Sequence, residues 1–427
     1  MLDVIRNSWA LLFGILLLMI GNGLHGTLVG VRGDLEGFST AELSIVMSAY
    51  FAGFLGGSQA APWMIRRVGH IRSFAALGSL VSAALILFPV IVDPIAWIAL
   101  RAIIGFCFSA VYVTAESWLN NSTTNENRGK TLSIYLVVQL SGVVIAQALL
   151  VMGDPAGFTL FIILSVLVSL SFAPILLTVT PTPPFEATKP MGLLEVIRVS
   201  PLGVVGMFVL GGIYSGMFGM SAIYGTEQGF SLGQISVFVA SFYVGGMVLQ
   251  YPIGWASDRM DRRLLILLTC AVGAVAGLAG ALFGGAFAIV LIAAALFGGL
   301  ANPLYALFLA YTNDFLEYEQ MAAAGGRLLF INGVGAIIGP IMIGLVIDYV
   351  GASGFFFFLA GLMAFMSIYA AYRMTVRPSP VSEATESYAP VLPQASPVVM
   401  EAVQEFYADA VEESAEADTD TSAEAAS

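Results

Sequence analysis

The stretch LLILLTCAVGAVAGLAGALFGGAFAIVLIAAALFGGLANPLYALFLAYT, residues 264–312, contains no Asp, Glu, Lys, Arg or His. It consists of two long apolar segments separated only by Gly284, Gly285 and Ala286. A helix of about 20 apolar residues spans the hydrocarbon core of a bilayer. Such a segment must be helical, because backbone N–H and C=O groups find no water in that core. The stretch therefore predicts two neighbouring transmembrane helices joined by a tight turn.

The same pattern recurs along the chain and predicts an all-α membrane protein with twelve spans. We expect them at residues 8–31, 42–65, 73–92, 95–119, 131–153, 157–179, 201–224, 232–256, 264–284, 287–312, 326–349 and 354–374. Residues 180–200 interrupt the pattern with four prolines and predict a linker. We therefore expect a first six-helix bundle in residues 1–179, a cytoplasmic linker in 180–200, a second six-helix bundle in 201–377 and a tail in 378–427.

The composition excludes a water-soluble globule. Hydrophobic residues make up 58% of the 427 residues and charged residues 10%, against about 45–50% and about 25% in soluble proteins. After Arg377 there are eleven Asp or Glu and no Lys or Arg, so the net charge of −12 belongs almost entirely to the tail. We expect a lipid bilayer around the body, no nucleic-acid partner, and a disordered acidic tail, because its large apolar residues are too few to form a core.

The positive charges predict the orientation of the spans. If Arg6 lies in the cytoplasm, fourteen of the sixteen Lys and Arg residues fall on the cytoplasmic side. Arg32 then falls outside and Arg101 lies within the membrane. Because cytoplasmic loops carry an excess of Lys and Arg, we predict that both termini are cytoplasmic.

The two halves repeat each other at a shift of 192 or 193 residues. The matching pairs are Gly37-Phe38-Ser39 with Gly229-Phe230-Ser231, Gly53 with Gly245, Gly105 with Gly298, Tyr112 with Tyr305 and Gly142 with Gly335. Two parallel repeats suit a transporter whose halves rock about a site at the membrane midplane. A duplicated static scaffold is the alternative.

Residues 254–263, GWASDRMDRR, resemble the signature loop of the major facilitator superfamily. That loop has Gly, three residues, Asp-Arg, one residue, Gly or Asp, and two basic residues. The equivalent first-half loop, residues 62–72, is degenerate, since Pro62 replaces the Gly and Arg66 replaces the Asp. Residues 101–105, RAIIG, are similar to the Arg-x-x-x-Gly motif that opens the family's fourth span.

Two further stretches refine the resemblance. Residues 335–340, GAIIGP, have a form that the family's antiporters carry in the fifth span, but here they lie in the eleventh, so antiport is not indicated. Residues 116–120, ESWLN, and 68–70, VGH, are similar to the family's bacterial YcaD-type branch. The resemblance covers residues 1–377 and implies a monomeric transporter of the bacterial inner membrane that needs no cofactor.

In the family, spans one, four, seven and ten line a central cavity, so the resemblance implies that Arg101 and His25 face it. A charge at the bilayer centre costs roughly 3 kcal/mol, and such a residue usually serves a cavity or a partner. We hypothesise that Arg101 binds an anionic or polar group of the substrate. His25 would carry a coupling proton, since its reference pKa of about 6.5 lies near physiological pH. A structural hydrogen bond for Arg101 and simple packing for His25 are the alternatives.

Uncharged polar residues of the same spans complete the predicted pocket. They are Asn22, Tyr214, Asn302 and Tyr305. Asn302 precedes Pro303, whose missing N–H predicts a kink beside the cavity. Each of these residues would otherwise form an ordinary interhelical hydrogen bond.

The motif loops predict a conformational gate at the cytoplasmic end of the protein. In the second half we expect its residues to be Gly254, Asp258, Arg259, Arg262 and Arg263. In the first half we expect Glu116 to supply the missing anion to Arg66, Arg67 or Arg72. Such charges can hold neighbouring helices together in one conformation and release them in another. The alternative is a positive cluster that only sets topology, and Asp314 is expected in a solvated loop.

These observations favour a secondary active transporter of a small molecule that works by alternating access and is coupled to H+. The chain has no Gly-x-x-x-x-Gly-Lys-Ser/Thr loop for ATP. A membrane receptor or assembly factor that signals through the tail is the alternative. A membrane enzyme is not expected, because His25 and His70 are predicted on opposite sides of the bilayer, so neither a catalytic set nor a metal site is expected.

Overall fold

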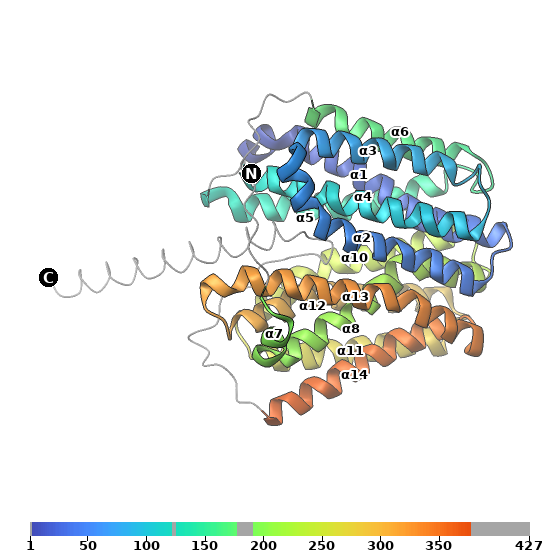
Figure 1. Cartoon of the computed structure of the whole chain (residues 1–427). Helices are drawn as coiled ribbons and strands as arrows, with labels where there is room; N and C mark the ends of the chain where they lie inside the picture. The colour runs from blue at the N-terminus through green and yellow to red at the C-terminus, as the bar shows by residue number, and fades with distance from the viewer. Residues whose placement is uncertain (1, 122–124, 177–190, 377–427) are drawn as a thin grey trace.

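The structure, a computed structural model, describes residues 2–121, 125–176 and 191–376 (Figure 1). Within these ranges the expectation of an all-helical protein is confirmed. The elements are α1 (Leu2–Leu35), α2 (Thr40–Val68), α3 (His70–Leu87), α4 (Pro94–Asn121), α5 (Asn125–Leu150), α6 (Thr159–Leu176), α7 (Leu193–Val199), α8 (Pro201–Ser215), the π-helix η1 (Gly216–Met220), α9 (Ser221–Glu227), α10 (Leu232–Ser257), α11 (Arg262–Leu282), α12 (Phe287–Asn313), α13 (Tyr318–Val350) and α14 (Gly354–Val376).

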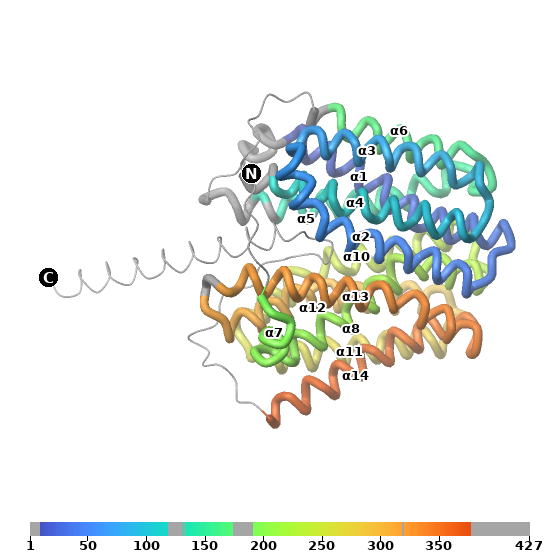
Figure 2. Tube along the Cα trace, in the orientation of Figure 1, coloured from blue at the N-terminus to red at the C-terminus, as the bar shows by residue number. Residues whose placement is uncertain are grey.

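The long helices form two bundles that lie side by side, α1–α6 in one and α8–α14 in the other (Figures 1 and 2). In the first bundle α2 packs on α4, α1 on α5, and α3 on α6. In the second bundle α10 packs on α12, α8 on α13, and α11 on α14. The two sets of pairs correspond under the shift found in the sequence, so the internal repeat is also a repeat of packing.

Glycines at matching positions make the closest helix contacts of each bundle. A Cβ atom on Gly53 would lie 1.9 Å from the carbonyl oxygen of Ala102, and one on Gly245 would lie 1.8 Å from that of Ala295. These approaches bring α2 against α4 and α10 against α12, and only glycine leaves room for them. Close packing through small residues matters in a bilayer, where hydrophobic burial does not drive helix association.

The repeated Gly-Phe-Ser segments begin α2 and α10 in the same way. Gly37 and Gly229 have φ angles of 78° and 70°, a region open to glycine. Ser39 and Ser231 then cap the two helices, each within a capping box.

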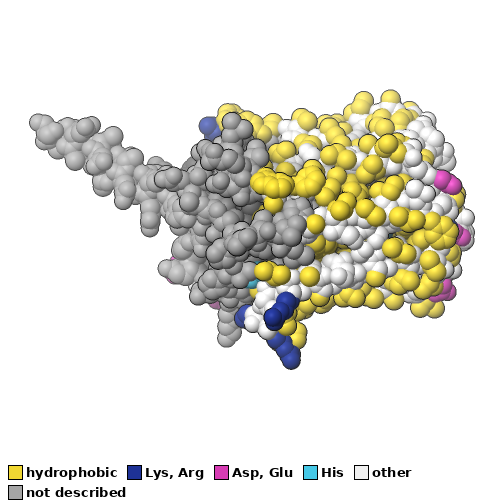
Figure 3. Space-filling model, turned by 90° about the horizontal axis from the view of Figure 1, so that it is seen from above, with side chains coloured by type: hydrophobic (Ala, Val, Ile, Leu, Met, Phe, Trp, Pro, Cys, Tyr) yellow, Lys and Arg dark blue, Asp and Glu magenta, His cyan; other side chains and the backbone are white. Residues whose placement is uncertain are grey.

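The helices suit a bilayer in length and surface. Within the described ranges, ten helical stretches are long and apolar enough to span a membrane, and Thr159–Ala173 in α6 forms a shorter apolar helix. The stretch in α2 is not among the ten, since its Ser, Gly and Gln residues lower its mean hydropathy. On the face shown in Figure 3, hydrophobic side chains cover the flank, with acidic groups at one end and Lys and Arg towards the other. The number of twelve spans stays a prediction.

The structure differs from the expected elements at the seventh span. The sequence predicts one continuous helix over residues 201–224, whereas the π-helix η1 interrupts it between α8 and α9. The segment GMFGM contains two glycines, and their missing side chains make room for neighbours: Ile343 at Gly216 and Met47 at Gly219. Residues 180–190 of the predicted linker and residues 378–427, the predicted tail, lie outside the described residues. The last part of the linker forms α7.

The two bundles are joined near one end. We call the end where α1 begins and α14 ends the proximal end, and the opposite end the distal end (Figure 1). Near the distal end, Thr40 Oγ1 donates to Glu227 Oε1 at 2.9 Å. The Ser236 hydroxyl also donates to the carbonyl oxygen of Gln147 there. These contacts connect α2 with α9 and α5 with α10.

Candidate functional site

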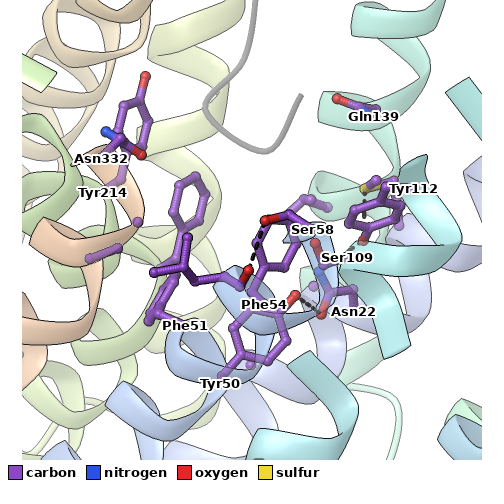
Figure 4. A pocket seen from close by; sticks show the side chains of 18 of the residues that line it. Asn22, Tyr50, Phe51, Phe54, Ser58, Ser109, Tyr112, Gln139, Tyr214 and Asn332 are labelled. Atoms are coloured by element: carbon purple, nitrogen blue, oxygen red, sulfur yellow. Dashed lines mark hydrogen bonds between the residues drawn. The ribbon is translucent and has the colours of Figure 1, made fainter. Parts of the chain in front are cut away.

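A cavity lies between the two bundles, and both bundles contribute to its wall (Figure 4). Its volume is about 110 Å³, room for several waters, since one water needs roughly 10–15 Å³. Seven aromatic rings contribute to the wall. The rings are Tyr50, Phe51, Phe54 and Tyr112 from the first bundle and Tyr214, Phe218 and Tyr243 from the second.

Arg101 is the one charged residue among the described residues that line the cavity. It stands on the second turn of α4, and its side chain is buried, with 3% of the residue exposed. Its guanidinium Cζ lies 4.6 Å from the centre of the Tyr50 ring, a cation–π contact. Its Nη2 also points at the sulfur of Met47, 3.3 Å away.

No carboxylate of the described residues neutralises this guanidinium. None of the ion pairs between described residues includes Arg101, and its Nε has no hydrogen-bond partner there. Buried charges are ordinarily paired, because moving a charge out of water is costly. The Tyr50 ring offsets only part of that cost. The described part of the site therefore carries one uncompensated positive charge.

His25 lies behind Arg101, away from the cavity. Arg101 Nη1 and His25 Nδ1 are 2.9 Å apart, and the imidazole is fully buried, with its edge against Phe88. A guanidinium has only donors, so Nδ1 must accept this hydrogen bond and the imidazole must be neutral. Its proton then sits on Nε2, which has no partner among the described residues.

Asn22 on α1 connects three helices at the wall of the cavity. Its Nδ2 donates to the hydroxyl of Tyr112 at 3.0 Å, and the hydroxyl of Tyr50 donates to its Oδ1 at 3.1 Å. Figure 4 shows Asn22 between the two rings. Both rings are held by their hydroxyl groups, so the aromatic wall of the first bundle has a fixed orientation.

Tyr214 and Asn302 form the corresponding contact of the second bundle. The Tyr214 hydroxyl lies 3.0 Å from the carbonyl oxygen of Asn302, directly before Pro303. The Asn302 side chain fits in because Gly246 has no Cβ, which would lie 2.5 Å from its Nδ2. Tyr214 also stacks on Phe218, with ring centres 5.6 Å apart.

Three of the predicted site residues therefore line the cavity together with Arg101: Asn22, Tyr214 and Asn302. Tyr305 is different. It is fully buried away from the wall, and its hydroxyl has no hydrogen-bond partner among the described residues.

The expected gate of the first bundle takes a different form. Glu116 is buried and accepts a hydrogen bond from the hydroxyl of Tyr135 on α5. The side chains of Arg66, Arg67 and Arg72 are exposed, and Arg67 lies over the ring of Trp63. The predicted pairing of Glu116 with one of these arginines is wrong for this conformation. The cause is that Glu116 faces the interior of its bundle, not the exposed loop.

The second motif loop holds α11 and α12 together at the proximal end. Arg262 forms a buried ion pair with Asp314, whose side chain is 2% exposed. The prediction of a solvated Asp314 is therefore wrong, because the end of α12 lies against the start of α11. Arg263 pairs with Asp261, 2.8 Å away.

The remaining residues of this loop lie in the last turn of α10 and directly after it. Arg259 is exposed and lies over Trp255, 4.5 Å from its ring centre. Gly254 is buried near the end of α10, and Asp258 is exposed just after it. The ion pair of Arg262 thus joins elements of one bundle and does not bridge the two bundles.

Part of the aromatic wall is not predicted by the sequence. The expected site residues lie in the first, fourth, seventh and tenth spans, whereas Tyr50, Phe51 and Phe54 come from α2. The available signal was the spacing of Tyr50, Phe54 and Ser58, four residues apart, which places them on one face of a helix. Among the described residues, no group of three or more His, Cys, Asp or Glu side chains is placed to hold a metal ion.

Two helix bundles around a central cavity with a buried charge in its wall, and with apolar flanks, define a polytopic membrane protein of the transporter type. The model of the Major Facilitator Superfamily matches residues 7–241 and 220–410. The chain belongs to this superfamily, which confirms the resemblance drawn from the motif loops.

Curated relatives and solved structures agree with this assignment. The chain is 27% identical over 344 residues to the uncharacterized MFS-type transporter YcaD of Escherichia coli O6:K15:H31 (strain 536 / UPEC), covering 78% of this chain and 87% of the relative. It is 26% identical to YcaD of Escherichia fergusonii, covering 84% and 93%. Its fold is similar to the nucleoside transporter NupG (D323A mutant), with a TM-score of 0.72, 14% identity and coverage of 86% and 99%.

A second solved structure has the same fold. It is a bacterial homolog of the human lysosomal transporter Spinster, in an inward-facing and unoccupied conformation, with a TM-score of 0.66 and 13% identity. The match covers 95% of this chain and 98% of that one. Membrane transport is the function of the class that these likenesses define.

Proposed function

We propose that the protein is a secondary active transporter that moves a small solute through the central cavity by alternating access. The cavity supports this most directly, because its wall is shared between the two bundles. A site of that kind opens to one side or the other when the bundles tilt. A static scaffold has no need for a cavity with a buried charge at such an interface.

The conformation described here would be the one closed at the distal end. The contacts of Thr40 with Glu227 and of Ser236 with Gln147 join the bundles there. We take the proximal end as cytoplasmic, since Arg259, Arg262 and Arg263 lie at that end. In this proposal α2 and α6 also cross the membrane, which gives twelve spans in a bacterial inner membrane with both termini cytoplasmic.

Arg101 would bind an anionic or polar group of the solute. It lines the cavity, and no carboxylate of the described residues is paired with it. A charge at the bilayer centre costs roughly 3 kcal/mol, so a solute that carries the opposite charge lowers the free energy of the site. Lys would not replace it fully, because only the guanidinium offers a fork of two donors.

His25 would carry the coupling proton. A proton on Nδ1 is incompatible with the hydrogen bond from Arg101, so protonation must free the guanidinium from the imidazole. The charged group that faces His25 among the described residues is Arg101 of α4, and Tyr50 of α2 lies against Arg101. Protonation adds a second cation beside Arg101, so binding of a proton and of an anion would favour each other, as symport requires.

The test is uptake into proteoliposomes that contain the purified protein. A mixed pool of small organic acids, amines and neutral polar solutes is added outside under an inwardly directed proton gradient, and the contents are identified by mass spectrometry. We expect accumulation of at least one solute, abolished by a protonophore and absent from protein-free liposomes. If no solute enters beyond the protein-free level, the transporter proposal is wrong.

A further inference from the structure

The wall of the cavity specifies more than a small solute. We propose that the solute is a planar aromatic or heterocyclic carboxylate, with its ring between the two aromatic walls and its carboxylate on Arg101. This inference rests on the proposed function for its biological meaning. The binding that it describes is a property of the cavity and is measurable without transport.

The charge of the wall selects the sign of the solute. Arg101 is the one charged residue in the described lining, which contains no Asp, Glu, Lys or His. A cationic solute would therefore meet an unopposed like charge, and a neutral one would leave the guanidinium unpaired. An anion pairs with it in surroundings of low polarity, where such a contact is stronger than in water.

An unsatisfied donor points to the same conclusion. Arg101 lines the cavity, and its buried Nε lacks a hydrogen-bond partner among the described residues. The guanidinium can donate but cannot accept. The missing partner must bring acceptors, and a carboxylate is acceptor-only when ionised. A planar carboxylate also matches the planar fork of a guanidinium.

The aromatic residues select the shape of the solute. Phe218 of η1 stacks on Tyr214 and lies 5.1 Å from Tyr243, and these rings form the wall of the second bundle. In the first bundle Phe54 lies 6.0 Å from Tyr50 and 6.1 Å from Tyr112. A flat ring between these walls gains offset-stacked or edge-to-face contacts that a saturated ring of the same size does not.

The repeat makes the cavity asymmetric and so orients the solute. The shift that relates the bundles matches Arg101 with Ala294 and His25 with Met217. The charge is thus present in the first bundle only, whereas aromatic rings come from both. A solute with one charged end and one flat end fits this arrangement in one orientation.

Three probes separate the two parts of the proposal. Benzoate is a planar anion, benzamide is its neutral planar counterpart, and cyclohexanecarboxylate is an anion without an aromatic ring. Binding of each to the purified full-length protein in detergent is measured by calorimetry at one pH. We expect benzoate to bind at least tenfold more tightly than either of the others. Equal binding of benzamide refutes the anionic class, equal binding of cyclohexanecarboxylate refutes the aromatic class, and no saturable binding of benzoate refutes both.

Matched variants test whether the probes bind in the cavity. Arg101→Gln should remove the preference for benzoate over benzamide, whereas Arg198→Gln, an exposed position on α7, should retain it. Phe218→Leu keeps the surface apolar but removes a ring, and it should reduce the preference for benzoate over cyclohexanecarboxylate while the preference over benzamide stays. The Phe218→Leu variant tests the proposal even if Arg101→Gln does not fold. Unchanged preferences in Phe218→Leu would refute the aromatic wall.

The outcome is distinguishable from a failure of the transporter proposal. Benzoate that binds with these preferences but never enters proteoliposomes would refute transport and leave the specificity of the cavity standing. Uptake of a neutral or non-aromatic solute, with no benzoate binding, would refute this inference and leave transport standing.

Discussion

Arg101 Nη1 lies 2.9 Å from His25 Nδ1, so the one cation of the cavity wall is hydrogen-bonded to a neutral imidazole. The pair joins α1 to α4 and has Tyr50 of α2 over the guanidinium. Protonation of His25 cannot preserve this bond, because both groups would then be donors. A proton at this position thus changes the group that is presented to the solute.

The first prediction concerns His25→Gln. The Gln Oε1 can accept the bond from Arg101, but Gln cannot be protonated, so the positive charge at the site stays constant. In the wild type, anion binding should tighten as the pH falls, because protonated His25 adds a second cation. In His25→Gln the affinity should be independent of pH over the range in which imidazole titrates, and proton-driven uptake should cease while solute exchange continues.

The control for this prediction is the second histidine. His70 on α3 lies against the hydroxyl of Ser117, 3.3 Å away, and is separated from the cavity wall. His70→Gln should retain the pH dependence of anion binding. A pH dependence that persists in His25→Gln would exclude His25 as the proton carrier.

The second prediction concerns the repeated glycines. Ala at Gly53 or Gly245 would place its Cβ less than 2 Å from a carbonyl oxygen of the neighbouring helix. Forcing a methyl group into a packed interface ordinarily costs about 1–3 kcal/mol, and more where backbone must move. Both variants should lower the yield of monodisperse protein and its melting temperature, as measured by size-exclusion chromatography and thermal unfolding in detergent.

Gly233→Ala is the matched control. A Cβ on Gly233, in the first turn of α10, meets no atom within 4 Å, and Ala is a better helix former than Gly. This variant should be as stable as the wild type or slightly more stable. Normal stability of Gly53→Ala would contradict the close approach of α2 and α4.

The repeat also illustrates how much the sequence alone predicts. The apolar run lengths predict most helices, because they depend on local composition, and the matching positions of Gly53, Gly105, Gly245 and Gly298 predict the repeat. The interruption at η1 was not predicted, since a π-helix depends on what packs beside Gly216 and Gly219, and those neighbours are far away in the sequence.

The sequence predicts which polar residues lie within the membrane-spanning segments, but it does not predict which residues they contact. Arg101 stood out because a charge within an apolar run is rare, and Asn22 and Asn302 because polar groups there are few. The partners of Glu116 and Arg262 were not predictable, because the rotation of each helix decides which of several nearby groups it faces. Helix rotation also explains why Tyr305, which was expected at the cavity, is not in its wall. Its matching residue in the first bundle, Tyr112, does line the cavity.

The third prediction concerns the ion pair of Arg262 and Asp314. Both side chains are almost fully buried, and removal of one partner from such a pair ordinarily costs about 3–5 kcal/mol, since it leaves a buried charge unpaired. Asp314→Asn should therefore lower the melting temperature markedly. The exchanged pair, Arg262→Asp with Asp314→Arg, should recover part of the loss.

Glu317→Gln provides the comparison, because Glu317 is an exposed acid three residues further along the same loop. Its removal should leave the melting temperature unchanged. The pair joins α11 to α12 within one bundle, so the effect should appear in stability rather than only in transport rate. If Asp314→Asn lost transport but kept wild-type stability, that result would instead support the conformational gate predicted from the motif.

The fourth prediction concerns closure at the distal end. Thr40 and Glu227 are hydrogen-bonded across the two bundles, so cysteines at both positions should be joined by a short bifunctional methanethiosulfonate. Cys107 and Cys270 are buried, with 1% and 0% exposed, so the reagent should react mainly with the introduced pair. Because alternating access requires this end to open, the cross-link should abolish uptake, and reduction should restore it. Each single-cysteine variant, treated in the same way, should keep its uptake; full transport by the cross-linked protein would mean that the bundles do not separate at the distal end.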